Sequence, residues 1–220
     1  MLTLTLVALI ISSMASALLL KRAAQPLVDD QPKATLQAAS LSLAFIGVAA
    51  LADLLTTQLV ASSGMDLQTF QRLLSNLAYY AAIPLLASAM LVSARNNHWS
   101  RPAWGRWLIG LFALFELLRR MEHGEIYTQM VAVAVSAAML ASAFMTGEKQ
   151  LRSITLLAAI NMAVALMLTG PGNLVVNPLA DSSYLYPLLL AAALPLCAMS
   201  IKQMIRFNSE QTSDKFKKQV

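Results

Sequence analysis

The positively charged residues of this chain alternate between the connections that join its long apolar segments. All of the 16 Lys and Arg except Arg72, Arg119 and Arg120 lie in every second connection. Those connections hold Lys21, Arg22 and Lys33, then Arg95, Arg101 and Arg106, then Lys149 and Arg152, and finally Lys202, Arg206, Lys215, Lys217 and Lys218. Because cytoplasmic loops of membrane proteins carry an excess of Lys and Arg, this alternation is typical of a polytopic membrane protein and predicts the direction of each span.

Apolar residues make up 58% of the 220-residue chain, and charged residues only 12%. Soluble domains have about 45–50% apolar and about 25% charged residues, so this chain has too little polar surface to fold in water. A bilayer core roughly 30 Å thick requires about 20 apolar residues per helix. Seven such spans account for most of the chain and leave no room for a soluble domain.

The apolar segments predict an all-α integral membrane protein with seven transmembrane helices. The predicted spans cover residues 1–20, 36–60, 69–94, a fourth segment that begins near residue 104, and then 126–145, 153–169 and 184–201. The charge alternation places the N-terminus outside and the C-terminus in the cytoplasm. We therefore expect a single seven-helix transmembrane domain over residues 1–203 and a basic cytoplasmic tail over residues 204–220, located in a bacterial cytoplasmic (inner) membrane. Trp99, Trp104 and Trp107 are expected to cluster at one membrane interface.

The fourth predicted span is the shortest, because only 12 residues separate Arg106 from Arg119. At about 1.5 Å per residue, it reaches the outer side only if Glu116, Arg119 and Arg120 sit at the outer boundary. The positive-inside rule is locally violated at that point.

Three groups of polar residues fall inside the predicted spans. A charge at the bilayer centre costs about 2.5–3.5 kcal/mol, so such residues usually face a partner or a water-filled cavity. The groups are Asp53 with Thr56 and Thr57, then Arg72 with Asn76 and Tyr79 or Tyr80, and then Glu116 with Arg119 or Arg120. The members of each group recur at three- or four-residue steps, which places them on one face of a helix.

The assigned directions place all three groups in the outer half of the membrane, where they would form one outward-facing polar pocket. Asp53 and Arg72 lie on consecutive antiparallel helices near the same outer loop, and we predict that they form a buried ion pair. The candidate ligand or ion site comprises Asp53, Thr57, Arg72, Asn76, Tyr80, Glu116, Arg119 and Asn161, and its candidate rim comprises Glu122, His123, Glu125, Asn173, Asn177 and Asp181. The competing interpretation is a structural salt-bridge cluster that fixes the register of the helices.

No familiar catalytic or cofactor motif occurs in the sequence. The two histidines, His98 and His123, fall on opposite sides of the predicted membrane, so they cannot together hold a haem or a metal ion. Cys197 is the only cysteine, which rules out a cysteine metal cluster. The loop serines have no base nearby in the sequence. The sequence therefore indicates no catalytic residue, no metal and no cofactor, and it disfavours an enzyme.

The net charge of +5 comes from residues in the loops that flank the membrane. These residues are expected to face anionic lipid headgroups on the cytoplasmic side, where each is worth about 1 kcal/mol, and no nucleic-acid partner is expected. Small residues at four-residue spacing, such as Ala134, Ala138 and Ser142, allow close helix packing within the chain, in a homo-oligomer or in a larger membrane complex.

Two classes of function are compatible with these features. The first is a small-solute or ion transporter, or a channel component, that uses the outward-facing polar pocket. The second is a non-catalytic membrane subunit or assembly protein of a larger complex, for which small-residue faces and the lack of a motif are natural. The gathering of polar groups at one membrane depth favours transport.

Overall fold

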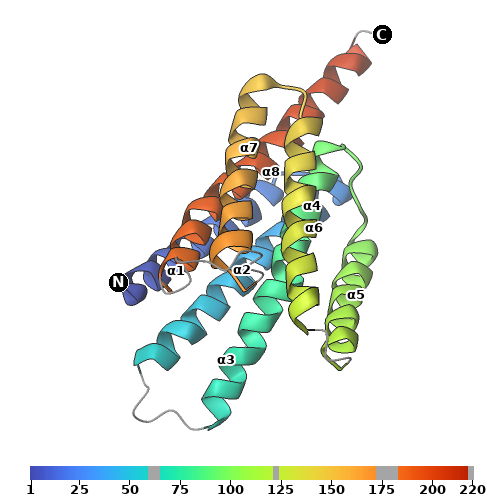
Figure 1. Cartoon of the computed structure of the whole chain (residues 1–220). Helices are drawn as coiled ribbons and strands as arrows, with labels where there is room; N and C mark the ends of the chain where they lie inside the picture. Colours follow the sequence, from blue (N-terminus) through green and yellow to red (C-terminus); the bar gives the residue numbers. More distant parts are fainter. Residues whose placement is uncertain (59–64, 121–123, 172–182, 218–220) are drawn as a thin grey trace.

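The computed structural model describes the chain except for residues 59–64, 121–123, 172–182 and 218–220 (Figure 1). The described elements are α1 (Leu2–Ala24), α2 (Asp30–Gln58), α3 (Met65–Leu77), the π-helical segment η1 (Ala78–Ala82), α4 (Ile83–Ala94), α5 (Arg101–Arg120), α6 (Gly124–Met145), α7 (Lys149–Val164), the π-helical segment η2 (Ala165–Thr169) and α8 (Leu185–Lys217). Within this described part, six helical stretches are long and apolar enough to cross a membrane. These are the features of an all-α polytopic membrane protein.

The six stretches correspond to six of the predicted spans. They are Leu2–Ala24, Asp30–Gln58, Asp66–Ala94, Ile126–Met145, Lys149–Thr169 and Leu185–Ser209. The predicted fourth span falls on α5, which is not one of them. Arg106 and Glu116 confine the uncharged part of α5 to residues 107–115, which is about 14 Å of helix at about 1.5 Å per residue. The count of seven apolar spans is therefore not reproduced among the described residues.

Helix α5 runs antiparallel to the continuous helix formed by α3, η1 and α4. Trp107 Nε1 donates a hydrogen bond to Ser88 Oγ at 3.1 Å. The ring of Phe115 stacks on that of Tyr80, with the two ring centroids 4.4 Å apart. Since a later residue of α5 contacts an earlier residue of the neighbouring helix, the two run in opposite directions, as Figure 1 shows.

The π-helical segment η1 lies directly before Pro84, the second residue of α4. A proline inside a helix lacks an N–H group, and its ring clashes with the carbonyl four residues earlier, here that of Tyr80. A π turn widens the backbone at this point. The helix therefore continues across the proline, from Asp66 to Ala94.

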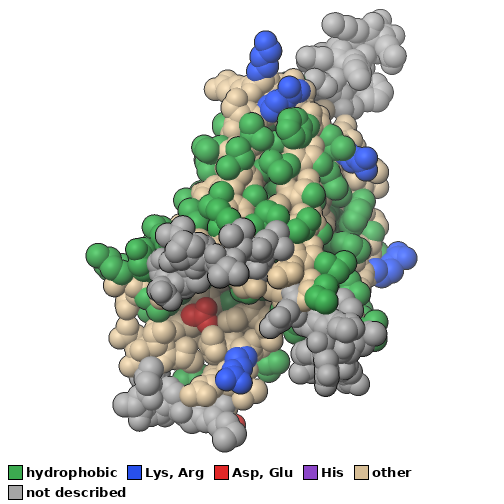
Figure 2. Space-filling model, viewed as in Figure 1, with side chains coloured by type: hydrophobic (Ala, Val, Ile, Leu, Met, Phe, Trp, Pro, Cys, Tyr) green, Lys and Arg blue, Asp and Glu red, His purple; other side chains and the backbone are tan. Residues whose placement is uncertain are grey.

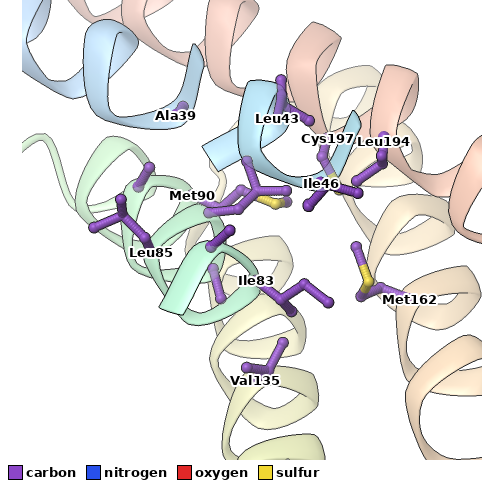
Figure 3. Close-up of a cluster of buried hydrophobic side chains, with 14 of the residues drawn as sticks. Ala39, Leu43, Ile46, Ile83, Leu85, Met90, Val135, Met162, Leu194 and Cys197 are labelled. Carbon is purple, nitrogen blue, oxygen red and sulfur yellow. The ribbon is translucent and has the colours of Figure 1, made fainter. Parts of the chain in front are cut away.

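Every described helical segment except α3 contributes buried residues to the apolar core, and Figure 3 shows a part of it formed by α2, α4, α6, α7 and α8. Leu43 of α2, Met90 of α4, Met162 of α7 and Leu194 of α8 are all completely buried. Figure 3 shows these side chains gathered with Ile46 between the helices. Because lipid tails are as apolar as the core, such close packing, rather than escape from water, holds the helices together.

Helix α1 approaches α2 closely through small residues. A Cβ atom placed on Gly47 would lie 2.6 Å from Ser13 Oγ, so glycine is the residue that fits this contact. Ser40 Oγ donates to the Ala17 carbonyl at 2.9 Å. Small residues of this kind let two helix backbones come together in lipid.

The three tryptophans cluster around the start of α5, as the sequence predicts. The ring centroid of Trp99 lies 4.9 Å from that of Trp104 and 6.2 Å from that of Trp107. At the same end of the molecule, Arg101 and Asp30 are joined by an exposed ion pair of 3.9 Å. The start of α5 is thereby attached to the start of α2.

His98 lies between α4 and α5, outside the membrane-spanning stretches. Its Nδ1 atom is 3.3 Å from Thr35 Oγ1 on α2. Burial lowers the pKa of His98 below its ordinary value of 6.5, and the nearby negative charge of Asp29 opposes this shift. The neutral form of the imidazole is therefore favoured in the folded protein.

Helix α8 continues beyond the predicted boundary of the tail. Met204 and Ile205 are buried, and Asn208 Nδ2 donates to the Ser93 carbonyl of α4 at 3.0 Å. The first part of the predicted tail is therefore a helical extension that packs on the bundle.

Large apolar side chains are exposed along the outside of the bundle. Ile11, Met130 and Leu157 are 64%, 62% and 57% exposed. In Figure 2, apolar side chains cover much of the long middle part of the face in view, while Lys and Arg lie mainly toward its ends and right edge. Soluble proteins rarely expose so much contiguous apolar surface, whereas lipid favours it.

Candidate functional site

The carboxylate of Asp53, in the C-terminal part of α2, accepts two hydrogen bonds from α3. Gln71 Nε2 lies 2.6 Å from Asp53 Oδ1, and Ser75 Oγ lies 3.0 Å from the same oxygen. Gln71 and Ser75 are one helical turn apart, so both reach one carboxylate. Asp53 is half-buried within the membrane-length stretch Asp30–Gln58. We call Asp53, Gln71 and Ser75 the carboxylate site.

No cation contacts Asp53 within the part of the chain that the structure describes. Arg72, its predicted partner, is exposed, and the salt bridge formed among the described side chains joins Arg101 to Asp30. The predicted Asp53–Arg72 ion pair is therefore wrong. Arg72 directly follows Gln71 in the chain, and successive residues turn about 100° around a helix, so its side chain leaves α3 in a different direction from that of Gln71.

A second group of residues lines a cavity of about 270 Å³ between the α3–η1 segment and α5. Asn76 and Tyr80 line it from one side, and Phe112, Phe115 and Glu116 line it from α5. We call this the aromatic cavity. Aromatic rings together with a few polar groups are the usual lining of small-molecule sites, and aromatic faces also attract cations.

Tyr80 connects three helices at the wall of the aromatic cavity. Its ring stacks on Phe115 of α5 and, at a centroid distance of 5.3 Å, on Tyr127 of α6. Its hydroxyl group is hydrogen-bonded to Thr128 Oγ1, while the neighbouring Tyr79 donates to the Thr128 carbonyl at 3.1 Å. Stacking and hydrogen bonding together fix the position of this ring.

The carboxylate site and the aromatic cavity lie on different sides of α3. The two α3 residues that contact Asp53 face α2, whereas Asn76 faces α5. The structure thus brings Asn76, Tyr80 and Glu116 together and separates them from Asp53. Two neighbouring sites take the place of the single pocket that the sequence predicts.

The other candidate residues lie outside both sites or outside the described residues. Thr57 is exposed and donates to the Leu54 carbonyl of its own helix at 2.8 Å. Asn161 is half-buried on α7, and its side chain forms no hydrogen bond with any described residue. Outside the described residues lie the side chain of Arg119 and those of the candidate rim, which are Glu122, His123, Glu125, Asn173, Asn177 and Asp181.

Sequence reasoning missed several residues of both sites. The four-residue spacing of Gln71 and Ser75, on the helix that follows Asp53, was a usable signal for the carboxylate site. Phe115 and Tyr127 gave no such signal, because their contacts with Tyr80 join separate helices.

No group of three or more His, Cys, Asp or Glu side chains that could hold a metal ion occurs among the described residues. Comparison of the chain with known protein families, with curated proteins and with solved structures finds no match. The functional interpretation therefore depends on the carboxylate site and the aromatic cavity.

Proposed function

We propose that this chain is a transporter, or a channel component, for a small solute or ion in a bacterial cytoplasmic membrane. The carboxylate site binds the ion, and the aromatic cavity receives a small solute. The chain crosses the membrane seven times, with its N-terminus outside and its C-terminus in the cytoplasm, so both sites lie in the outer half of the membrane.

The position of the Asp53 carboxylate carries this proposal. It lies within an apolar helix, and the described residues that contact it, Gln71 and Ser75, are neutral hydrogen-bond donors. A charge at the bilayer centre costs about 2.5–3.5 kcal/mol, so an intramembrane carboxylate is a candidate for proton or ion movement. Binding a proton or a small cation removes this cost, and carboxylate, amide and hydroxyl oxygens suit hard cations.

The direction of α5 supports the seventh crossing. It runs antiparallel to Asp66–Ala94, and α6 begins beside η1, where Tyr127 stacks on Tyr80. With α5 as a crossing helix, Lys149 lies on the same side of the membrane as Lys21, as the positive-inside rule requires. Without it, these two residues would lie on opposite sides.

Cysteine labelling in intact cells tests this topology. In a Cys197→Ser background, Asp66→Cys is expected to react with a membrane-impermeant maleimide from outside. Lys149→Cys is expected to react only after the cells are opened. Labelling of both positions from the same side would overturn the seventh crossing.

Ion movement is tested with purified protein in liposomes under an imposed Na⁺ or proton gradient. The unmodified protein is expected to carry one of these ions, and Asp53→Asn is expected to reduce that flux about tenfold or more, because it removes the intramembrane charge. Asp66→Asn is the matched control, since it changes an exposed carboxylate at the start of α3 and should leave the flux unchanged.

An equal flux in the Asp53→Asn variant would contradict the proposal. If the unmodified protein carries neither ion, the better proposal is a non-catalytic membrane subunit or assembly protein of a larger complex. Reduced membrane abundance of the Asp53→Asn variant, with constant co-purification of one larger complex, would then identify a non-catalytic subunit or assembly protein.

A further inference from the structure

We infer that the groove between α1 and α8 binds an anionic phospholipid. The phosphate of the headgroup lies between Arg22 and Lys202, and an acyl chain lies along the apolar part of the groove. None of the groove residues belongs to the carboxylate site or the aromatic cavity, so this inference goes beyond the proposed transport function and does not depend on it.

The groove consists of two adjoining cavities of about 550 and 420 Å³. Ala15 and Leu19 line both cavities, so one continues into the other. Along α1 the lining extends from Ala8 to Ala23, which is about 22 Å of helix at about 1.5 Å per residue. This length exceeds the roughly 15 Å of hydrocarbon in one leaflet, so an acyl chain fits along it.

Small side chains on both helices create this space. Ser12 and Ser16 of α1 line the groove opposite Ala191 and Ala198 of α8. Ser12 Oγ also donates a hydrogen bond to the Ala191 carbonyl, which joins the two helices. Because this hydroxyl group is satisfied within the protein, the groove presents mainly apolar surface to an occupant.

Two positive charges lie at one end of the groove. Arg22 of α1 and Lys202 of α8 line the same cavity, and both side chains are exposed. Neither forms a salt bridge with a described residue. Like charges that face one cavity repel each other, and an anion between them removes that repulsion. Basic pockets between transmembrane helices bind phospholipid headgroups in this way.

Charge and shape together select the occupant. Free phosphate would contact the two cations but leave the apolar part of the groove empty. A zwitterionic lipid would fill the apolar part but would bring no net negative charge to the cations. An anionic phospholipid satisfies both parts, since α1 and α8 run side by side and carry their cations at the same end (Figure 1).

Native mass spectrometry of the full-length protein in detergent tests this inference, with phosphatidylglycerol and phosphatidylcholine as the probes. Phosphatidylglycerol is expected to bind more tightly. The double variant Arg22→Gln with Lys202→Gln is expected to weaken phosphatidylglycerol binding about twenty-fivefold, since each cation near an anionic headgroup contributes roughly fivefold. Lys21→Gln with Lys149→Gln is the matched control, because it removes two exposed cations that do not line the groove.

Three outcomes would overturn the inference. They are equal binding of the two lipids, unchanged phosphatidylglycerol binding in the groove variant, and an equal loss in the control variant. Ala15→Trp tests the apolar part, because it fills the point where the cavities join and is expected to weaken lipid binding.

A second measurement uses the unmodified protein and so does not depend on the folding of any variant. A photoreactive phosphatidylglycerol analogue is expected to cross-link to residues 8–23 of α1 and 191–202 of α8. Cross-links confined to other helices would overturn the inference.

Discussion

The two sides of α3 are built from different chemistry. Toward α2, the charge of Asp53 is held by two hydrogen bonds in a position where lipid makes charge costly. Toward α5, stacked rings around Tyr80 hold three helices together. We therefore expect the Asp53 side to lower stability, as a binding site for an ion would, and the Tyr80 side to stabilise the fold.

Phe115→Ala is expected to have the largest effect on stability, because it breaks the aromatic side of this comparison. We expect the free energy of unfolding to fall by about 2–3 kcal/mol, since truncation removes both packing and ring stacking at a half-buried position. Unfolding by sodium dodecyl sulfate in mixed micelles measures the change. Phe112→Ala is the matched control, since Phe112 lines the same cavity but is 39% exposed. Equal losses in the two variants would show that stacking on Tyr80 contributes nothing.

Asp53→Asn is expected to act in the opposite direction and raise the free energy of unfolding at neutral pH by about 1–2 kcal/mol. The amide oxygen still accepts hydrogen bonds from Gln71 and Ser75, while the cost of a charge inside the membrane disappears. The same unfolding titration measures this gain. A loss of stability would instead favour the structural interpretation of Asp53.

Tyr80→Phe is expected to lower the free energy of unfolding by about 0.5–1 kcal/mol, because it keeps the stacked ring and removes one hydrogen bond. The bond lost is the one to Thr128 Oγ1. A double-mutant cycle with Thr128→Val isolates it. Strict additivity of the two substitutions would mean that this hydrogen bond does not contribute to stability.

His98 lies outside both the carboxylate site and the aromatic cavity, so its effect on stability is independent of them. Its pKa is lowered in the folded state, so below pH 6.5 the unfolded chain takes up a proton more readily than the folded protein does. Stability is therefore expected to be unaffected above pH 6.5 and to decline as the pH falls below it. His98→Gln should remove this decline in unfolding titrations between pH 7.5 and 5.5. An unchanged pH profile in the variant would assign the decline to another group.

The spans could be predicted wherever about 20 apolar residues follow one another without a charge. The predicted fifth span, residues 126–145, has the bounds of the observed stretch Ile126–Met145. Helix α5 could not be predicted as well, because its uncharged part is short. Its position depends instead on contacts such as those of Trp107 with Ser88 and of Phe115 with Tyr80.

The polar sites could be predicted only in part. Periodicity identifies residues that share a face of a helix, but it does not identify the neighbouring helix that the face meets. The sequence predicted that the Arg72 face of α3 meets Asp53. In the structure, the side chain of the adjacent Gln71 contacts Asp53 instead. The ring contacts of Tyr80 with Phe115 and Tyr127 join separate helices, and helical periodicity carries no information about them.

The π-helical segment η1 sets the rotation of α3 relative to α4. A π turn holds about one residue more than an α turn, so deleting one residue from Ala78–Ala82 would restore regular α-helix. The π turn takes up the roughly 100° of rotation that one extra residue adds to an α-helix, so α3 and α4 keep the angular relation of an uninterrupted helix. If Ala78–Ala82 were α-helical without a deletion, α3 would turn by about 100° relative to α4. Gln71 and Ser75 would then leave Asp53, although no side chain had changed. The π turn thus decides whether the carboxylate has its hydrogen-bond donors.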